Sequence, residues 1–177
     1  MIRFLKYGTA AAVALTATFA LASAALAAPE ARTVLIKDKC DTATFDAAVG
    51  PGACTRGEGV AFGTFVSQLT ASRQAGGWRF APGQLSIPSG TDLTVINTGG
   101  ETHTFTTVAN FGPGFVPFLN VLVFGPGATA IPEFNPVNPA TARFMPPGAT
   151  RTLSIAPGTY KFECGIHPWM QTTVTVG

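Results

Sequence analysis

The chain has 177 residues, of which 46% are hydrophobic and only 11% charged, and a formal net charge of +2. Arg3 and Lys6 lie in an apolar leader, and without them nine cationic side chains stand against nine acidic ones. This length is sufficient for one domain with its own core, and the lack of a basic run argues against nucleic acid as a partner.

The first 27 residues are typical of a secretory signal peptide. A positively charged start is followed by an apolar run, and residues 25–27 (Ala-Leu-Ala) form a small-x-small cleavage site. The alternative is an uncleaved membrane anchor, because residues 7–28 carry no charge and are just long enough to span a bilayer. The Ala-rich composition and the processing motif favour cleavage. We therefore expect a periplasmic or secreted protein with no membrane span after cleavage.

Residues 28–77 are expected to form an N-terminal strand followed by an extension. The β-branched and apolar residues 33–37 predict the strand. Residues 41–49 indicate a short helix that ends in a Gly-Pro-Gly turn. Over residues 60–70 the apolar side chains are spaced closer to a helical than to an alternating pattern, which indicates a second short helix.

Two cysteines, Cys40 and Cys54, lie fourteen positions apart in this extension. In an exported chain such a pair favours a disulfide, which would pin the extension down. Two free buried thiols are the alternative. A second metal site is less favoured, because no histidine lies near either cysteine.

Regular β patterns begin at Trp78 and predict an all-β domain over residues 78–177. Short alternating segments are separated by turns rich in Gly, Pro, Ser and Asn, which is typical of a β-sandwich. The expected strands cover residues 78–80, 84–87, 91–97, 103–108, 150–155, 159–164 and 171–176. The loop between the last two joins neighbouring strands, and such a loop can hold functional side chains rigidly.

An insertion over residues 109–148 interrupts this pattern. Its eight prolines argue against a central strand or a long helix, and it also contains six phenylalanines. An irregular segment of this length in a compact domain is often functional. The alternative is a flap whose rings fill space over the core. We expect different phenylalanines to serve each role.

Four candidate metal ligands lie at the ends of predicted strands. Cys164, His167 and Met170 fall within seven residues, and His103 lies on an upstream strand. Two imidazoles, a thiolate and a thioether are the ligand set of a blue-copper site, in which a trigonal His₂Cys plane is completed by a weak axial Met. The chain contains no other histidine. We therefore expect one type 1 copper ion per chain.

Each of these residues has a structural alternative when taken alone: a core histidine, a buried thiol or an apolar filler. Their joint placement at one strand–loop–strand junction argues against coincidence. Zinc is the nearest alternative metal, but a thioether is a poor zinc ligand, and Cys/His₂ alone lacks the usual fourth structural ligand. The sequence contains no Gly-x-Ser-x-Gly elbow, no phosphate loop and no nucleophile with a free partner base, so we do not expect an enzyme.

Residues 78–177 resemble the cupredoxins, the small blue-copper proteins. The compact Cys-x-x-His-Pro-x-Met loop is similar to that of amicyanin. Further shared features are the Pro-x-x-Leu-x-Ile strand, Gly90, the Asn97 turn, the Tyr160-x-Phe162-x-Cys164 strand and the terminal Thr-Val-Thr-Val strand. The resemblance implies a Greek-key β-sandwich in which His103, Cys164 and His167 are equatorial copper ligands and Met170 is the axial ligand.

The chain departs from the family pattern in three places. Many cupredoxins carry Asn directly after the first ligand histidine, where this chain has Thr104, so we expect different hydrogen bonds around the ligands. His103 and Cys164 are 61 positions apart, which makes the insertion longer than in amicyanin or plastocyanin. The Cys40–Cys54 extension is not part of the minimal fold.

The resemblance also implies a soluble one-electron carrier that docks redox partners. In the family, electrons pass through the exposed edge of the C-terminal-loop histidine, here His167, which an apolar patch surrounds. The candidate patch residues are Pro168, Trp169, Phe111, Phe115 and Phe118. Zero net charge suits docking by apolar contact better than long-range steering.

Two other functions compete with the electron carrier. Copper storage or delivery often uses exposed Met/His clusters, and this sequence has none. Copper-based catalysis needs an open coordination position, whereas four protein ligands including an axial Met leave no ready vacancy. Reduction by a redox partner at useful rates would separate a carrier from a storage protein.

Overall fold

The computed structural model describes residues 32–177. The signal peptide expected over residues 1–27, with its cleavage site, lies outside the described residues. Within residues 32–177 none of the helices has both the length and the apolar character needed to cross a membrane.

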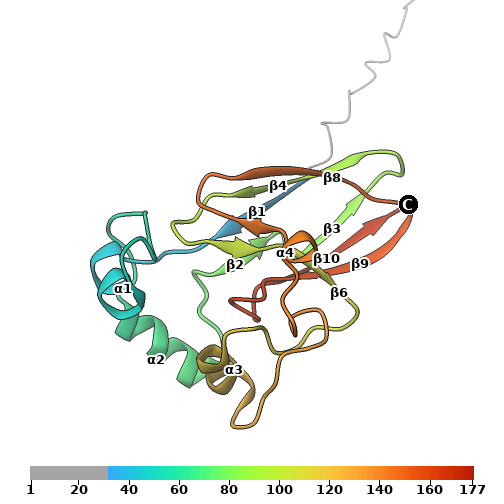
Figure 1. Cartoon of the computed structure of the whole chain (residues 1–177). Helices are drawn as coiled ribbons and strands as arrows, with labels where there is room; N and C mark the ends of the chain where they lie inside the picture. The colour runs from blue at the N-terminus through green and yellow to red at the C-terminus, as the bar shows by residue number, and fades with distance from the viewer. Residues whose placement is uncertain (1–31) are drawn as a thin grey trace, which may run out of the picture.

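Two four-stranded sheets form the body of the protein (Figure 1). In spatial order, the first sheet contains β2 (Arg79–Ala81), β1 (Thr33–Lys37), β4 (Asp92–Asn97) and β8 (Thr150–Ser154). The second contains β3 (Gln84–Ile87), β10 (Gln171–Val176), β9 (Gly158–Glu163) and β6 (Thr106–Val108). A separate two-stranded ribbon joins β5 (His103–Thr104) to β7 (Phe144–Met145).

The alternating sequence pattern explains the core between the sheets. Val34 and Ile36 of β1 are fully buried, as are Leu93 and Val95 of β4, because every second side chain of a strand points to the same face. The expectation of a mostly β fold is confirmed. Its Greek-key connectivity stays a prediction.

The N-terminal strand lies inside the first sheet. β1 pairs antiparallel with β2 and parallel with β4, so it is an interior strand of the sandwich. The second sheet also contains a parallel pair, formed by β3 and β10. The β structure therefore begins at Thr33, well before Trp78, where the sequence pattern becomes regular.

Two helices at one end of the sandwich form an aromatic cluster. They are α1 (Thr42–Val49) and α2 (Phe62–Ser72), and Figure 1 shows both beyond the ends of the sheets. Asp41 caps α1 by accepting a hydrogen bond from the backbone nitrogen of Thr44 at 2.9 Å. The ring centroids of Phe65 and Trp78 lie 4.6 Å apart, and those of Phe45 and Trp78 lie 5.8 Å apart. This aromatic contact attaches the extension to the sandwich.

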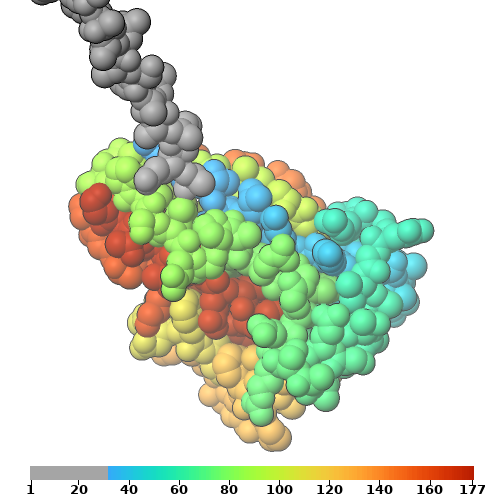
Figure 2. All heavy atoms as spheres, turned by 180° about the vertical axis from the view of Figure 1, so that it is seen from behind, coloured from blue at the N-terminus to red at the C-terminus, as the bar shows by residue number. Residues whose placement is uncertain are grey.

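The insertion contains short regular elements that begin at prolines. They are α3 (Pro117–Phe124) and α4 (Pro139–Ala142), and both start with proline because the first helical position needs no backbone N–H. β7 follows and pairs with β5, so that Met145 lies opposite His103. Seen from behind in Figure 2, the orange part of the insertion lies beside the green part of the extension. The insertion thus packs at the same end of the molecule as α1 and α2.

A disulfide joins Cys40 to Cys54, with their Cα atoms 6.0 Å apart. Both sulfurs belong to buried residues, and the closed loop contains α1. Cys40 also forms an isolated β-bridge with Val60 just before α2. The crosslink therefore holds the segment after α1 to the segment that follows β1.

Replacing Cys40 and Cys54 together by alanine is expected to lower the free energy of unfolding by about 3 kcal/mol, because closing a loop of this length restricts the unfolded chain. Urea denaturation under non-reducing conditions measures the change. Reductant should destabilise the native protein by a similar amount and leave the variant unaffected. A loss well below about 1 kcal/mol would contradict this estimate.

Candidate metal centre

Three donor atoms from two segments of the chain meet inside the protein. The Nδ1 atoms of His103 and His167 lie 3.2 Å apart, and Cys164 Sγ lies 3.8 Å from the first and 3.9 Å from the second. None of the three residues is more than 3% exposed. This triangle of two imidazoles and one thiol is the arrangement that a single metal ion requires.

The strands and a tight loop bring these donors together. His103 begins β5, and Cys164 directly follows β9. The backbone nitrogen of Met170 donates to His167 O at 2.8 Å, and that of Cys164 donates to Met170 O at 3.1 Å. These bonds close the ligand loop on itself, and Met170 ends it as a fully buried side chain. The sequence-predicted ligands His103, Cys164, His167 and Met170 are thus all placed at one end of the sandwich.

Thr104 connects the two ligand-bearing segments. Its hydroxyl oxygen accepts a hydrogen bond from the backbone nitrogen of Gly165 at 2.8 Å, and its own backbone nitrogen donates to Cys164 Sγ at 3.3 Å. Thr104 occupies the position where the family pattern often has Asn. A hydroxyl therefore ties the loops together here in place of an amide.

A carboxylate that sequence reasoning missed lies behind His103. Asp38 Oδ2 is 2.9 Å from His103 Nε2, and both side chains are fully buried. Asp38 also accepts hydrogen bonds from the backbone nitrogens of Gly100 at 2.9 Å, Glu101 at 3.0 Å and Cys40 at 3.3 Å. Because His103 Nε2–H donates to Asp38, its Nδ1 lone pair is left for a metal.

The sequence contained a signal for Asp38. Val34 and Ile36 alternate toward the core, and the next position in the same register is Asp38. A carboxylate at an inward-facing position needs a buried partner. The chain has two histidines, and both were already expected at the metal site, so one of them was the natural partner for this carboxylate.

A second carboxylate lies near the other histidine. Glu101 Oε1 is 3.8 Å from His167 Nε2, and Glu101 Oε2 accepts a short hydrogen bond from Trp78 Nε1. Each histidine therefore has a carboxylate close to its outer ring nitrogen. In metal sites such outer partners fix the ring and its tautomer.

Burial and hydrogen bonding shift the pKa values of these groups. Burial by itself would raise the pKa of Asp38, but the hydrogen bonds from His103, Gly100 and Glu101 together lower it to about 2. Burial raises the pKa of Glu101. Burial also opposes ionisation of Cys164, yet its contacts with His103 and His167 hold the thiol pKa well below its ordinary value. The site therefore favours the thiolate, the form that binds metals.

A third buried carboxyl group, Glu163, precedes Cys164. Its Oε2 accepts a hydrogen bond from the backbone nitrogen of Gly112 at 3.0 Å, while Oε1 has no partner among the described residues. Burial is the main reason why its pKa is raised to about 8. Glu163 ties the start of the insertion to the ligand strand.

The outer edge of His167 is covered. The family resemblance predicts an exposed edge, but the residue is only 3% exposed. Its ring contacts Trp169 of the ligand loop, at a centroid distance of 5.3 Å, and Phe65 of α2, at 6.3 Å. The helical extension, which the family pattern does not contain, explains this burial.

An apolar hollow of about 180 Å³ lies over His167 and Glu101. It is lined mainly by apolar side chains of the extension, the insertion and the ligand loop, which are Phe45, Val49, Phe62, Phe65, Val116, Phe118, Leu119 and Ile166. Val49 is 66% exposed and Phe118 53% exposed. The insertion therefore borders the end of the sandwich that carries the candidate ligands.

The other candidate docking residues lie in different surroundings. The backbone nitrogen of Phe115 donates to Gly165 O at 2.8 Å, and its ring contacts Phe134. Phe111 lies under the Lys161 ammonium, 5.7 Å from the ring centroid. Pro168 is buried and Trp169 half-buried. Of these rings, Phe118 is the one that lines the hollow over His167, and a docking role for each of them stays a prediction.

Gly99→Ala is expected to destabilise the protein by about 1–3 kcal/mol, because a Cβ there would collide with the Asp38 carboxylate. Thermal or urea unfolding measures the loss. Gly83→Ala is the matched control, since a Cβ at Gly83 would have no atom within 4 Å. Equal stability of the two variants would show that Asp38 is held less rigidly than described.

Neither a protein-family model nor a curated protein matches the chain. Among solved structures, a purple cupredoxin from Nitrosopumilus maritimus is similar, with 17% identity, 82% of this chain and 98% of that chain covered, and a TM-score of 0.44. A methionine-to-alanine mutant of amicyanin in the Cu(I) state has 20% identity, coverages of 56% and 73%, and a TM-score of 0.37. A reduced tryptophan-to-tyrosine mutant of amicyanin has 20% identity, coverages of 59% and 78%, and a TM-score of 0.38.

These similar structures are cupredoxins, the family whose motifs residues 78–177 resemble. At such identities and TM-scores they carry no information about the ligands of this chain. Its chemistry therefore follows from its own residues.

Proposed function

We propose that this protein binds one type 1 copper ion through His103, Cys164, His167 and Met170 and carries single electrons between redox partners. The supporting observation is the buried triangle of two imidazole Nδ1 atoms and a thiol sulfur, with no pair more than 3.9 Å apart. A thioether side chain ends the same loop. Copper bound by this set supplies a one-electron Cu(II)/Cu(I) couple.

The donor chemistry fits copper better than other metals. Thiolate and thioether sulfur are soft ligands that select Cu(I), whereas imidazole suits both oxidation states. Magnesium and calcium require oxygen ligands, which the triangle lacks. Zinc would lack a usual fourth ligand, because a thioether is poor for that ion.

The surroundings favour electron transfer over exchange of the metal. The ligand loop is closed by its own backbone bonds, Thr104 ties it to the strand of His103, and Asp38 holds the His103 ring. Ligands held this rigidly reorganise little when an electron arrives or leaves. Copper storage or delivery remains the alternative function, but the burial of all three donors opposes release to a receiver. Four protein ligands also leave no vacancy for catalysis.

The proposed location is the periplasm or the exterior of the cell. The disulfide between Cys40 and Cys54 fits an oxidising compartment.

The proposed docking surface for one redox partner is the apolar hollow over His167 with its exposed rim. Two exposed apolar side chains line this hollow, Phe118 on α3 and Val49 on α1. Two further residues of α3, Val121 and Phe124, are also exposed.

The Cu(II) protein is expected to show an intense visible absorption band from thiolate-to-copper charge transfer. Cys164→Ser should remove this band, because a hydroxyl cannot replace the thiolate. Absorption spectroscopy after copper loading provides the test, and the Cys40/Cys54 double alanine variant, which keeps the ligand thiol, is the control. A colourless copper complex of the native protein would contradict the assignment.

Met170→Gln is expected to retain copper and lower the reduction potential, because an amide oxygen favours Cu(II) whereas a thioether favours Cu(I). Voltammetry measures the shift. Met145→Leu is the control, since Met145 is also fully buried and lies opposite His103 but is not assigned as a ligand. If Met145→Leu shifted the potential and Met170→Gln did not, the axial assignment would pass to Met145.

Asp38→Asn is expected to raise the reduction potential by tens of millivolts or more, because it removes a buried negative charge that stabilises Cu(II) over Cu(I). The amide oxygen can still accept the hydrogen bond from His103 Nε2, so the visible band should persist. Asp92→Asn is the control, as it removes the same charge from an exposed position on β4. Equal potentials for the two variants would show that Asp38 has no electrostatic effect on the metal.

A further inference from the structure

The surface of this protein carries more positive charge than its composition suggests. Residues 32–177 contain nine Lys and Arg side chains, none of them buried, and eight Asp and Glu side chains. Three of these acids, Asp38, Glu101 and Glu163, are buried at the metal centre. Five acids therefore face nine cations outside. The formally neutral composition hid this asymmetry, because sequence alone does not show which acids are buried.

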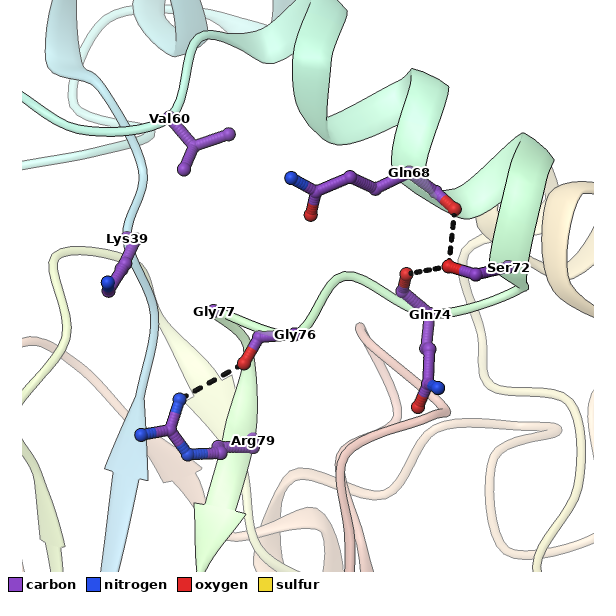
Figure 3. Close-up of a pocket in the computed structure, with 8 residues that line it drawn as sticks. All are labelled: Lys39, Val60, Gln68, Ser72, Gln74, Gly76, Gly77 and Arg79. Atoms are coloured by element: carbon purple, nitrogen blue, oxygen red, sulfur yellow. Dashed lines mark hydrogen bonds between the residues drawn. The ribbon is translucent and has the colours of Figure 1, made fainter.

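Four of the cations gather in one place, which we call the basic face: Lys37, Lys39, Arg56 and Arg79. They line a hollow of about 300 Å³ together with Asp38, Gly77 and Thr98. Lys39 and Arg79 also line an adjoining hollow of about 550 Å³. Figure 3 shows Lys39 and Arg79 on one side of this larger hollow and the α2 side chains on the other.

Within residues 32–177 no cation of the basic face forms an ion pair with a carboxylate. Lys37 and Arg79 are directly opposite in the antiparallel pairing of β1 with β2, where like charges are unfavourable. Among residues 32–177, the only ion pairs are His103 with Asp38 and His167 with Glu101. Arg79 donates to Gly76 O instead of to a carboxylate. An anionic partner would relieve this repulsion.

The basic face is next to the metal centre. Lys37 and Lys39 are exposed or half-exposed, and Asp38 between them points inward. Asp38 is both a lining residue of the smaller hollow and the hydrogen-bond partner of His103 Nε2. A single carboxylate side chain therefore separates the basic face from a proposed copper ligand, on the His103 side of the site.

We propose that the basic face is the docking surface for a redox protein with an acidic face. This inference rests on the proposed carrier function. A carrier receives an electron from one partner and gives it to another. This protein has two chemically distinct surfaces for these two encounters, the apolar hollow at His167 and the basic face at His103. Charge complementarity would speed association with an acidic partner at low ionic strength.

The first test maps anion binding by NMR, with hexacyanochromate(III) as a paramagnetic and redox-inert probe added to the Cu(I) protein. Amide signals of Lys39, Gly77 and Arg79 should broaden first. The double variant Lys39→Glu/Arg79→Glu should abolish this broadening. The matched control Arg32→Glu/Arg151→Glu makes the same charge change at other exposed positions and should leave it in place.

The second test measures oxidation of the Cu(I) protein by stopped flow. One electron passes from Cu(I), which becomes Cu(II), to hexacyanoferrate(III), which becomes hexacyanoferrate(II). The Lys39→Glu/Arg79→Glu variant should slow this reaction several-fold at low salt and speed oxidation by the cationic tris(phenanthroline)cobalt(III). Added salt should diminish both effects. Lys39→Gln/Arg79→Gln should give smaller changes in the same directions.

The outcomes separate the two proposals. Broadening centred on Arg143 or Lys161, or equal rate changes for the anionic and cationic oxidants, would overturn the basic face as a docking surface. A copper-loaded protein without a reversible one-electron couple would instead overturn the carrier function, whatever the broadening map shows.

Discussion

The buried hydrogen bond between Asp38 and His103 is the contact on which the candidate metal centre depends. Removing a carboxylate from water is costly unless its oxygens are all satisfied, and Asp38 meets that condition with one imidazole and three backbone nitrogens. Those donors come from the segment that follows β1, the turn after β4 and the first ligand strand. One side chain therefore fixes three segments, and Gly99 must lack a side chain to leave it room.

Carboxylates beside both histidines give this site its electrostatic character. Asp38 and Glu101 each approach an outer ring nitrogen, and Trp78 orients Glu101. Trp78 in turn packs in the aromatic cluster of α1 and α2. The extension thus acts on the candidate metal centre in two ways: it covers His167 with Phe65 and supports a carboxylate next to it. An extension that looks peripheral in the sequence is part of the site.

Sequence patterns predicted the strands and the candidate ligands because both leave direct traces. Strict alternation identifies strands such as β3 and β10, and the rarity of His made His103 and His167 conspicuous. The pairing of β5 with β7 left no trace, since a two-residue strand among prolines shows no period. The covering of His167 was also hidden, because it depends on how α2 packs against the ligand loop. Asp38 was the one omission that register alone could have corrected.

The positions of β1 and β10 affect how the chain folds. β1 is the first strand of residues 32–177 and β10 the last, yet each lies in the interior of its sheet. Thr33 pairs with Thr94, and Gln84 pairs with Thr173, so both sheets are assembled from contacts that are distant in sequence. Such non-local pairing makes folding slow compared with a helical bundle of similar size. Until both of these strands are in place, the neighbours β4 and β9 present unpaired edges to solvent, a state in which association between chains competes with folding.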